Sequence, residues 1–73
     1  MSKVIIFTET ILTTVEPKRV FKAAEECLVE VRVVESKRED SRWIYEYEVK
    51  GEIGKIEKFF HRIKGLDRKT NKL

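Results

Sequence analysis

The sequence predicts one α+β domain whose elements follow in the order strand, helix, strand, strand, helix. Three observations carry this prediction. The chain has 73 residues, which suffices for a single core. Apolar residues recur with period two in some segments and with a period near 3.6 in two others. Hydrophobic residues make up 41% and charged residues 40% of the chain, a composition that is apolar enough to fold although it is unusually rich in ions.

The first element is a strand rich in β-branched side chains. Residues 4–15 read VIIFTETILTTV and contain no Gly, Asn or Pro that would favour a turn. We therefore expect one long strand. A hairpin broken at residues 8–10 is the weaker alternative.

A helix over residues 17–28 follows. Pro17 suits the first helical position, and Glu16 or Thr14 can cap the helix in front of it. Apolar residues then recur at helical spacing. They are Val20, Phe21, Ala24, Cys27 and Leu28.

Alternation of apolar with polar residues predicts the next two strands. The first contains Val29, Val31 and Val33, and the second contains Trp43, Tyr45, Tyr47 and Val49. Between them lies the polar segment 36–41, SKREDS, which suits a hairpin loop.

A second helix is expected over residues 52–64. Gly51 ends the preceding strand, and Gly65 is the expected C-cap. The apolar stripe of this helix consists of Ile53, Ile56, Phe59, Phe60, Ile63 and Leu66. We expect the domain to span residues 1–65 and residues 66–73 to form a basic C-terminal tail, with a short fourth strand at 66–71 as an open alternative.

This layout resembles a ferredoxin-like two-layer sandwich, in which two helices cover one face of an antiparallel sheet. The weakly strand-like C-terminus leaves the first strand with an unpaired edge, which a symmetric dimer would cover. The sheet face away from the helices is also expected to carry apolar side chains, which favours a homodimer. The expected interface residues are Val4, Ile6, Leu12, Val34 and Ile44. A homo-oligomeric interaction or adaptor subunit is therefore one functional hypothesis, and a partner within a larger protein complex would use the same face.

The other functional hypothesis is a small nucleic-acid-associated module, with RNA favoured over DNA. Residues 55–73 hold seven cationic side chains against two carboxylates, and such a strip could follow phosphates. The expected contacts are Lys55, Lys58, Arg62, Lys64, Arg68, Lys69 and Lys72. The competing interpretation is a solvated helix face, since late-turn cations also suit the helix dipole.

The aromatic residues Trp43, Tyr45 and Tyr47 could stack unpaired bases. Their alternation with Glu46 and Glu48 favours core packing instead, because exposing the rings would force those carboxylates inward.

No residue pattern predicts a catalytic site, a metal site or a cofactor. Two glycines, Gly51 and Gly54, have the spacing of a phosphate-clamping loop, but a strand exit explains them. His61 with Glu57 offers only two metal ligands, and Cys27 is expected to be buried and inert. We therefore expect a non-enzymatic protein.

The chain has no apolar run of the ~20 residues that span a bilayer and no signal-peptide pattern, so we expect no membrane association and a cytoplasmic location. Abundant Glu, Lys and Arg with no Gln are typical of proteins from hot environments.

Overall fold

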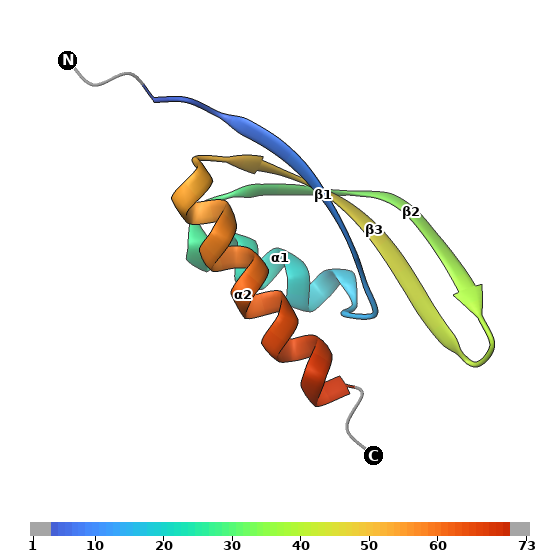
Figure 1. The fold of residues 1–73 in the computed structure, drawn as a ribbon. Coiled ribbons are helices and arrows are strands. Elements are labelled where there is room, and N and C mark those ends of the chain that lie inside the picture. Colours follow the sequence, from blue (N-terminus) through green and yellow to red (C-terminus); the bar gives the residue numbers. More distant parts are fainter. Residues whose placement is uncertain (1–3, 71–73) are drawn as a thin grey trace.

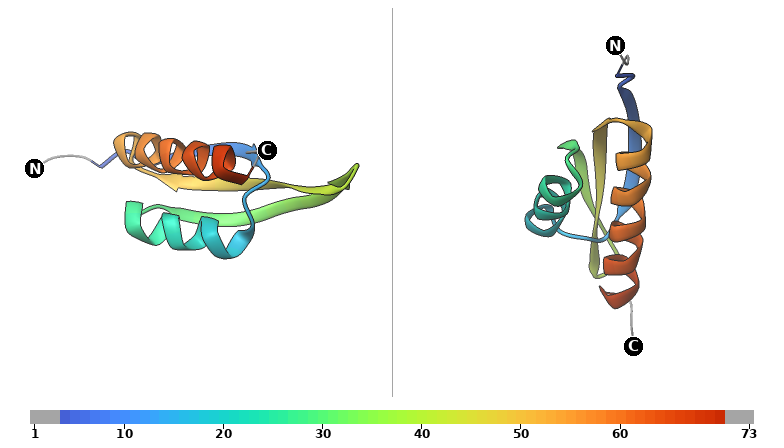
Figure 2. Two further views of the ribbon diagram at one scale, coloured as in Figure 1. Left: turned by 90° about the horizontal axis from the view of Figure 1, so that it is seen from below. Right: turned by 90° about the vertical axis from the view of Figure 1, so that its left-hand side faces the viewer.

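The computed structural model describes residues 4–70 and has the expected β-α-β-β-α order (Figure 1). Its elements are β1 (Phe7–Thr13), α1 (Pro17–Cys27), β2 (Glu30–Glu39), β3 (Arg42–Gly51) and α2 (Ile53–Thr70). The strands form one antiparallel sheet in the order β1-β3-β2. Both helices lie on the same face of that sheet (Figure 2). The predicted α+β layout is thus confirmed.

The core lies between the two helices and the covered part of the sheet. Its buried residues are Val15, Val20, Ala23, Ala24, Cys27, Val29, Tyr47, Val49, Ile56, Phe59 and Ile63. The alternation along β3 is confirmed, because Tyr47 and Val49 are buried while Lys50 is exposed. On α1 the expected stripe was too wide: Phe21 is exposed, and Leu28 follows the helix as its C-cap with a left-handed φ of 60°.

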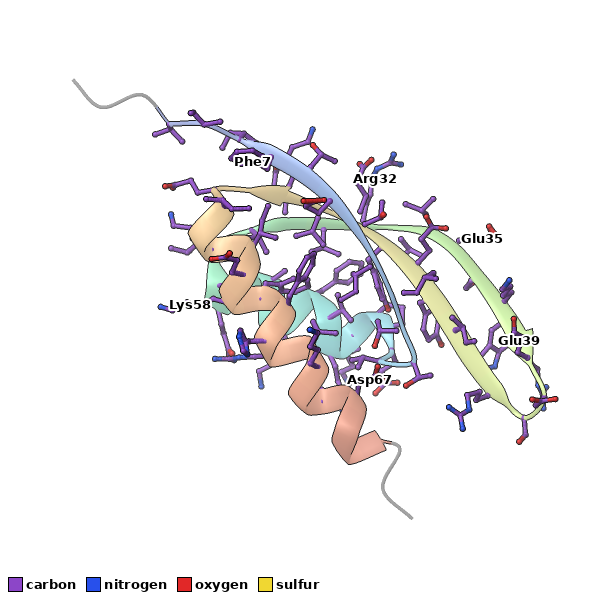
Figure 3. The ribbon with its side chains drawn as sticks, in the orientation of Figure 1. Phe7, Arg32, Glu35, Glu39, Lys58 and Asp67 are labelled. Atoms are coloured by element: carbon purple, nitrogen blue, oxygen red, sulfur yellow. The ribbon has the colours of Figure 1, made fainter. Side chains whose placement is uncertain are left out.

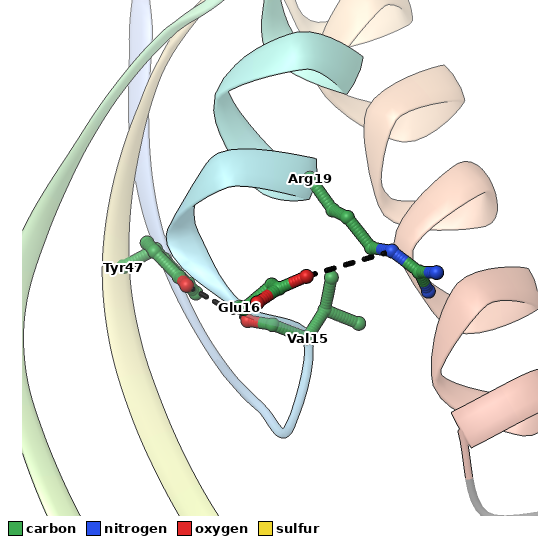
Figure 4. Close-up of polar contacts among 4 residues, drawn as sticks. All are labelled: Val15, Glu16, Arg19 and Tyr47. Carbon is green, nitrogen blue, oxygen red and sulfur yellow. Dashed lines mark hydrogen bonds and ion pairs between the residues drawn. The ribbon is translucent and has the colours of Figure 1, made fainter.

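One buried hydrogen bond ties the central strand to the β1–α1 connection. The hydroxyl of Tyr47 donates to the carbonyl oxygen of Val15 over 2.8 Å (Figure 4). The pKa of Tyr47 is raised above its ordinary value, mainly by burial of the hydroxyl. The phenol therefore stays protonated, and remains a hydrogen-bond donor, at neutral pH. The bond satisfies a carbonyl that would otherwise be costly to bury.

The first strand is shorter than predicted. β1 pairs with β3 from Phe7, opposite Gly51, to Thr13, opposite Tyr45. Residues 4–6 precede β1 and do not pair with β3, because β3 ends at Gly51. After Thr13 the chain turns, and the hydroxyl of Thr13 accepts a hydrogen bond from the N–H of Val15 over 3.2 Å.

The predicted loop at 36–41 was wrong. Both strands continue through it, and only Asp40 and Ser41 form the turn. Asp40 adopts a φ of 57°, a left-handed conformation that Asp tolerates better than most residues. The hairpin therefore reaches beyond the ends of both helices (Figure 2), and the molecule measures 50 × 22 × 15 Å.

The C-terminal part of the prediction also needs correction. α2 continues to Thr70, so residues 66–70 form neither a fourth strand nor a separate tail, and Gly65 is helical rather than a C-cap. Residue 71 of the expected strand lies outside the described residues. Leu66 packs against the core, and the Asp67 carboxylate accepts hydrogen bonds from the Thr14 hydroxyl and, over 3.3 Å, from the Thr14 N–H. These contacts outweigh the cost of a helical glycine, about 1 kcal/mol.

Replacing Tyr47 with Phe should destabilise the fold by about 1–2 kcal/mol, because it leaves the Val15 carbonyl without its donor. Urea unfolding followed by circular dichroism measures the change. Tyr45→Phe is the matched control, since that ring is only partly buried. Equal losses for both variants would contradict the role given to the Tyr47 hydroxyl.

Candidate interaction surfaces

The two edges of the sheet differ in how they are protected against pairing with another strand. β2 carries a bulge between Val33 and Glu35 and charged side chains along its length; Figure 3 shows Arg32, Glu35 and Glu39 projecting from it. β1 pairs with β3 without any register shift, and its one charged residue is Glu9. Bulges and charges are the usual means of blocking an edge. The β1 edge is therefore open to strand pairing, whereas the β2 edge is not.

The segment that leads into β1 adds an exposed apolar surface at this edge. Val4 and Ile5 are each 63% exposed, and Ile6 is 54% exposed. Ile53, at the start of α2, is also exposed. Contiguous apolar exposure of this kind marks interaction sites on soluble domains.

α2 lies over β1 and beside α1 (Figure 2). Its N-terminal end follows Gly51, which pairs with Phe7, and its C-terminal part contacts Thr14 through Asp67. On its surface a hollow of about 580 Å³ is lined by Gly54, Glu57, Lys58, Phe60, His61 and Lys64. The helix therefore runs the length of the open edge and presents both signs of charge near Phe60.

The cations predicted to bind nucleic acid do not all remain available. Lys55 forms an ion pair with Glu52 at 2.9 Å, and Arg62 forms one with Glu26 of α1. Lys58 is exposed and points away from the sheet (Figure 3). Lys64 is exposed on the same helix. Pairing of Lys55 and Arg62 lowers the positive charge that this face offers to phosphates.

The remaining predicted cations are not positioned by the structure. Arg68 and Lys69 belong to the last turn of α2, but their side chains lie outside the described part of the chain. Lys72 also lies outside it. Binding along α2 stays a prediction.

The five predicted interface residues do not form one patch. Leu12 and Ile44 line a hollow of about 400 Å³ on the open sheet face, among the charged residues Glu35, Lys37, Glu39 and Glu46. Val34 lies at the bulge on the opposite edge strand, and Val4 and Ile6 precede β1. The alternation-based assignment missed this separation because neither the bulge nor the point at which β1 begins is visible in a period-two pattern.

An ion pair crosses the open face between β2 and β3. The Nε of Arg32 donates to a Glu48 carboxylate oxygen over 2.7 Å. This hydrogen bond is the main cause that lowers the pKa of Glu48 below its ordinary value, and it raises the pKa of Arg32. The centre of this face is thus a solvated, ion-paired surface.

The aromatic residues of β3 are buried to different depths. The ring centroids of Trp43 and Tyr45 are 6.5 Å apart with an interplanar angle of 20°, and those of Tyr45 and Tyr47 are 6.0 Å apart. Tyr47 is buried, Tyr45 is partly buried, and Trp43 is 49% exposed. The predicted core packing therefore holds for Tyr47 but not for Trp43. The sequence placed all three rings on the helix side of the sheet. It did not reveal that the hairpin extends past the helices, so that no helix covers Trp43.

A groove of about 350 Å³ lies where Trp43 and Tyr45 meet the start of α1. Its lining includes Val15, Glu16, Arg19, Arg42, Trp43 and Tyr45. Arg19 is 3.8 Å from Glu16, a loose and exposed pair. No motif marked this groove, because its two walls are more than twenty residues apart in the sequence.

Other candidate groups find structural explanations. A Cβ on Gly51 would lie 2.9 Å from Cγ1 of Val29, so packing requires this glycine. Cys27 is buried. Within residues 4–67, whose side chains the structure describes, no group of three His, Cys, Asp or Glu residues could hold a metal ion. In the same part of the chain, no helix is long and apolar enough to cross a membrane.

Comparisons with protein-family models, with curated proteins and with solved structures found no match for this chain.

Replacing Arg32 with Met should raise the pKa of Glu48 toward its ordinary value, because the carboxylate loses its donor. In the wild type, this pair contributes to the free energy of unfolding at pH values above the pKa that Glu48 has in the unfolded chain. That contribution is lost as the pH falls through the lowered pKa of the folded state. Titration of the side-chain carboxyl by NMR measures the shift, with Lys37→Met as the control that breaks only the Lys37–Glu39 pair. A wild-type Glu48 pKa above the ordinary value would show that a partner buries this face.

Proposed function

We propose that this protein is a self-associating interaction subunit that joins a second copy of itself through the outer edge of β1. The observation that carries the proposal is the contrast between the two edge strands. β1 has neither bulge nor edge cations, whereas β2 has a bulge at Val34 and charges on both sides of it. An unprotected edge exposes backbone donors and acceptors that another strand can satisfy.

The ferredoxin-like plan explains what is missing at this edge. In the complete split β-α-β motif a fourth strand covers the first, but here the corresponding residues 66–70 belong to α2. We assign the place of that strand to β1 of the second copy. Antiparallel pairing of the two β1 strands would join the sheets into one six-stranded sheet with all four helices on one face, a closed two-fold arrangement.

The charges on α2 favour a second copy over an unrelated partner. Phe7 lies beside the start of α2 and Thr14 beside Asp67, so the middle of β1 at Thr10 lies alongside the region of Phe60. A two-fold axis there makes the two α2 helices antiparallel neighbours. Glu57 of one copy then lies opposite Lys64 of the partner subunit, because the two positions lie on either side of the axis, three residues before and four residues after Phe60. The surface is thereby complementary to itself in charge.

The strand β1 also contains little that would oppose self-pairing. Thr8, Thr10 and Leu12 share the open face and carry no charge. Glu9 is on the other face and lies opposite Ile11 of the partner subunit when the axis passes Thr10, so no two carboxylates are directly paired. The apolar residues 4–7 extend the buried area at the ends of the joint sheet.

The protein should sediment as a dimer at tens of micromolar, and Thr10→Lys should weaken the dimer at least about tenfold. The substitution places two ammonium groups opposite each other at the axis, a like-charge contact that disfavours strand pairing. Sedimentation equilibrium measures the dissociation constant. Ser36→Lys is the matched control, because it adds the same charge to an exposed hydroxyl residue of β2. A monomeric wild type, or equal weakening by both variants, would contradict pairing through β1.

Charge exchange on α2 tests the two-fold arrangement separately. Glu57→Lys and Lys64→Glu should each weaken the dimer about five- to tenfold, because each turns two symmetric attractions into repulsions. The double variant should recover the wild-type dissociation constant, since both pairs are restored with their signs exchanged. Additive loss in the double variant would rule out Glu57 and Lys64 as partners across the axis.

A further inference from the structure

We propose that the groove between the hairpin and the start of α1 binds single-stranded nucleic acid, with a base stacked on Trp43. This site is distinct from the basic face of α2 and from the β1 edge. All of its walls come from one chain, so it does not depend on the proposed dimer.

The stacking surface is already built in the structure. Trp43 is 49% exposed although it lies on the helix side of the sheet, because the hairpin projects beyond α1 and α2. The ring of Tyr45 stacks with that of Trp43 at a centroid distance of 6.5 Å and an interplanar angle of 20°. The exposed half of the ring leaves an apolar surface that a planar ligand would cover.

The charge around the rings selects the class of ligand. Arg19 and Arg42 line the groove, and Arg38 is the cross-strand neighbour of Trp43. The one carboxylate in the lining is Glu16, which is only loosely paired with Arg19 at 3.8 Å. Guanidinium groups beside an aromatic surface disfavour a cationic ligand and suit one that combines planar rings with anionic groups.

Nucleic acid has this combination, and the single-stranded form is the one that fits. Bases within a duplex are stacked on each other and cannot reach Trp43 without unpairing. An unpaired base can stack on the ring while neighbouring phosphates meet the arginines, whose planar donors also suit phosphate oxygens. The groove of about 350 Å³ has room for one base.

The single tryptophan of the chain allows a direct test. We expect a twelve-nucleotide oligouridylate to quench the fluorescence of the wild-type protein at about 50 mM salt, and the apparent affinity to fall steeply at about 200 mM. Oligodeoxythymidylate of the same length should quench similarly, because stacking and phosphate contacts are common to RNA and DNA. A blunt duplex should leave the fluorescence unchanged. Quenching by the duplex as strong as by the single strands would overturn the stacking assignment, and so would the absence of any quenching.

Variants assign the contact to this groove. With a dye-labelled oligouridylate and fluorescence anisotropy, Trp43→Ala should weaken binding about tenfold or more, whereas Trp43→Phe should retain most of it. Arg38→Glu should weaken binding, while Lys58→Glu, the same reversal on α2, should leave it unchanged. Circular dichroism confirms that each variant is folded. Loss of binding in Lys58→Glu with wild-type binding in Arg38→Glu would overturn the proposal and place the contact on α2.

The same measurement on Thr10→Lys separates this proposal from the proposed self-association. The groove predicts that a monomeric variant still binds the oligonucleotide with the wild-type affinity per chain. Loss of binding together with loss of the dimer would show that the site requires the partner subunit, which would contradict a groove formed by one chain.

Discussion

The structure depends on β3 because it is the strand paired on both sides. Its residues Tyr47 and Val49 are fully buried in the core. The Tyr47 hydroxyl also donates a hydrogen bond to the carbonyl of Val15, where the chain passes from β1 to α1. A small domain has few such cross-links and correspondingly little stability to spare. One strand therefore positions both neighbouring strands and the entry to the first helix.

The two helices are too short to cover the whole helix-side face of a three-stranded sheet with so long a hairpin. Two regions of the sheet are left uncovered. One uncovered region is the outer edge of β1, which pairs with β3 on one side only. The other is the far half of the hairpin, where Trp43 continues an aromatic row beyond the helices. The two proposed roles follow from these two regions. Strand pairing would satisfy backbone groups, and base stacking would cover an aromatic ring.

Ion pairs decide which charged surfaces are available to partners. Lys55 and Arg62 are matched within the chain by Glu52 and Glu26, and Arg32 is matched by Glu48. Exposed pairs of this kind contribute little to stability. They do, however, reduce the net charge that a face presents. For this reason a count of cations along α2 overstates its attraction for phosphates.

The sequence alone determined the element order and most of the core, because period-two and period-3.6 patterns report which side chains face inward. It also indicated the open first-strand edge. Tertiary structure decided what local patterns cannot encode: α2 continues past Gly65 because Asp67 and Leu66 find contacts far away in the chain, and β2 changes face at a bulge. It also decided that Trp43 is exposed, since that depends on the length of the helices relative to the hairpin. Burial is a property of the assembled layers, and periodicity specifies only the side of a sheet on which a residue lies.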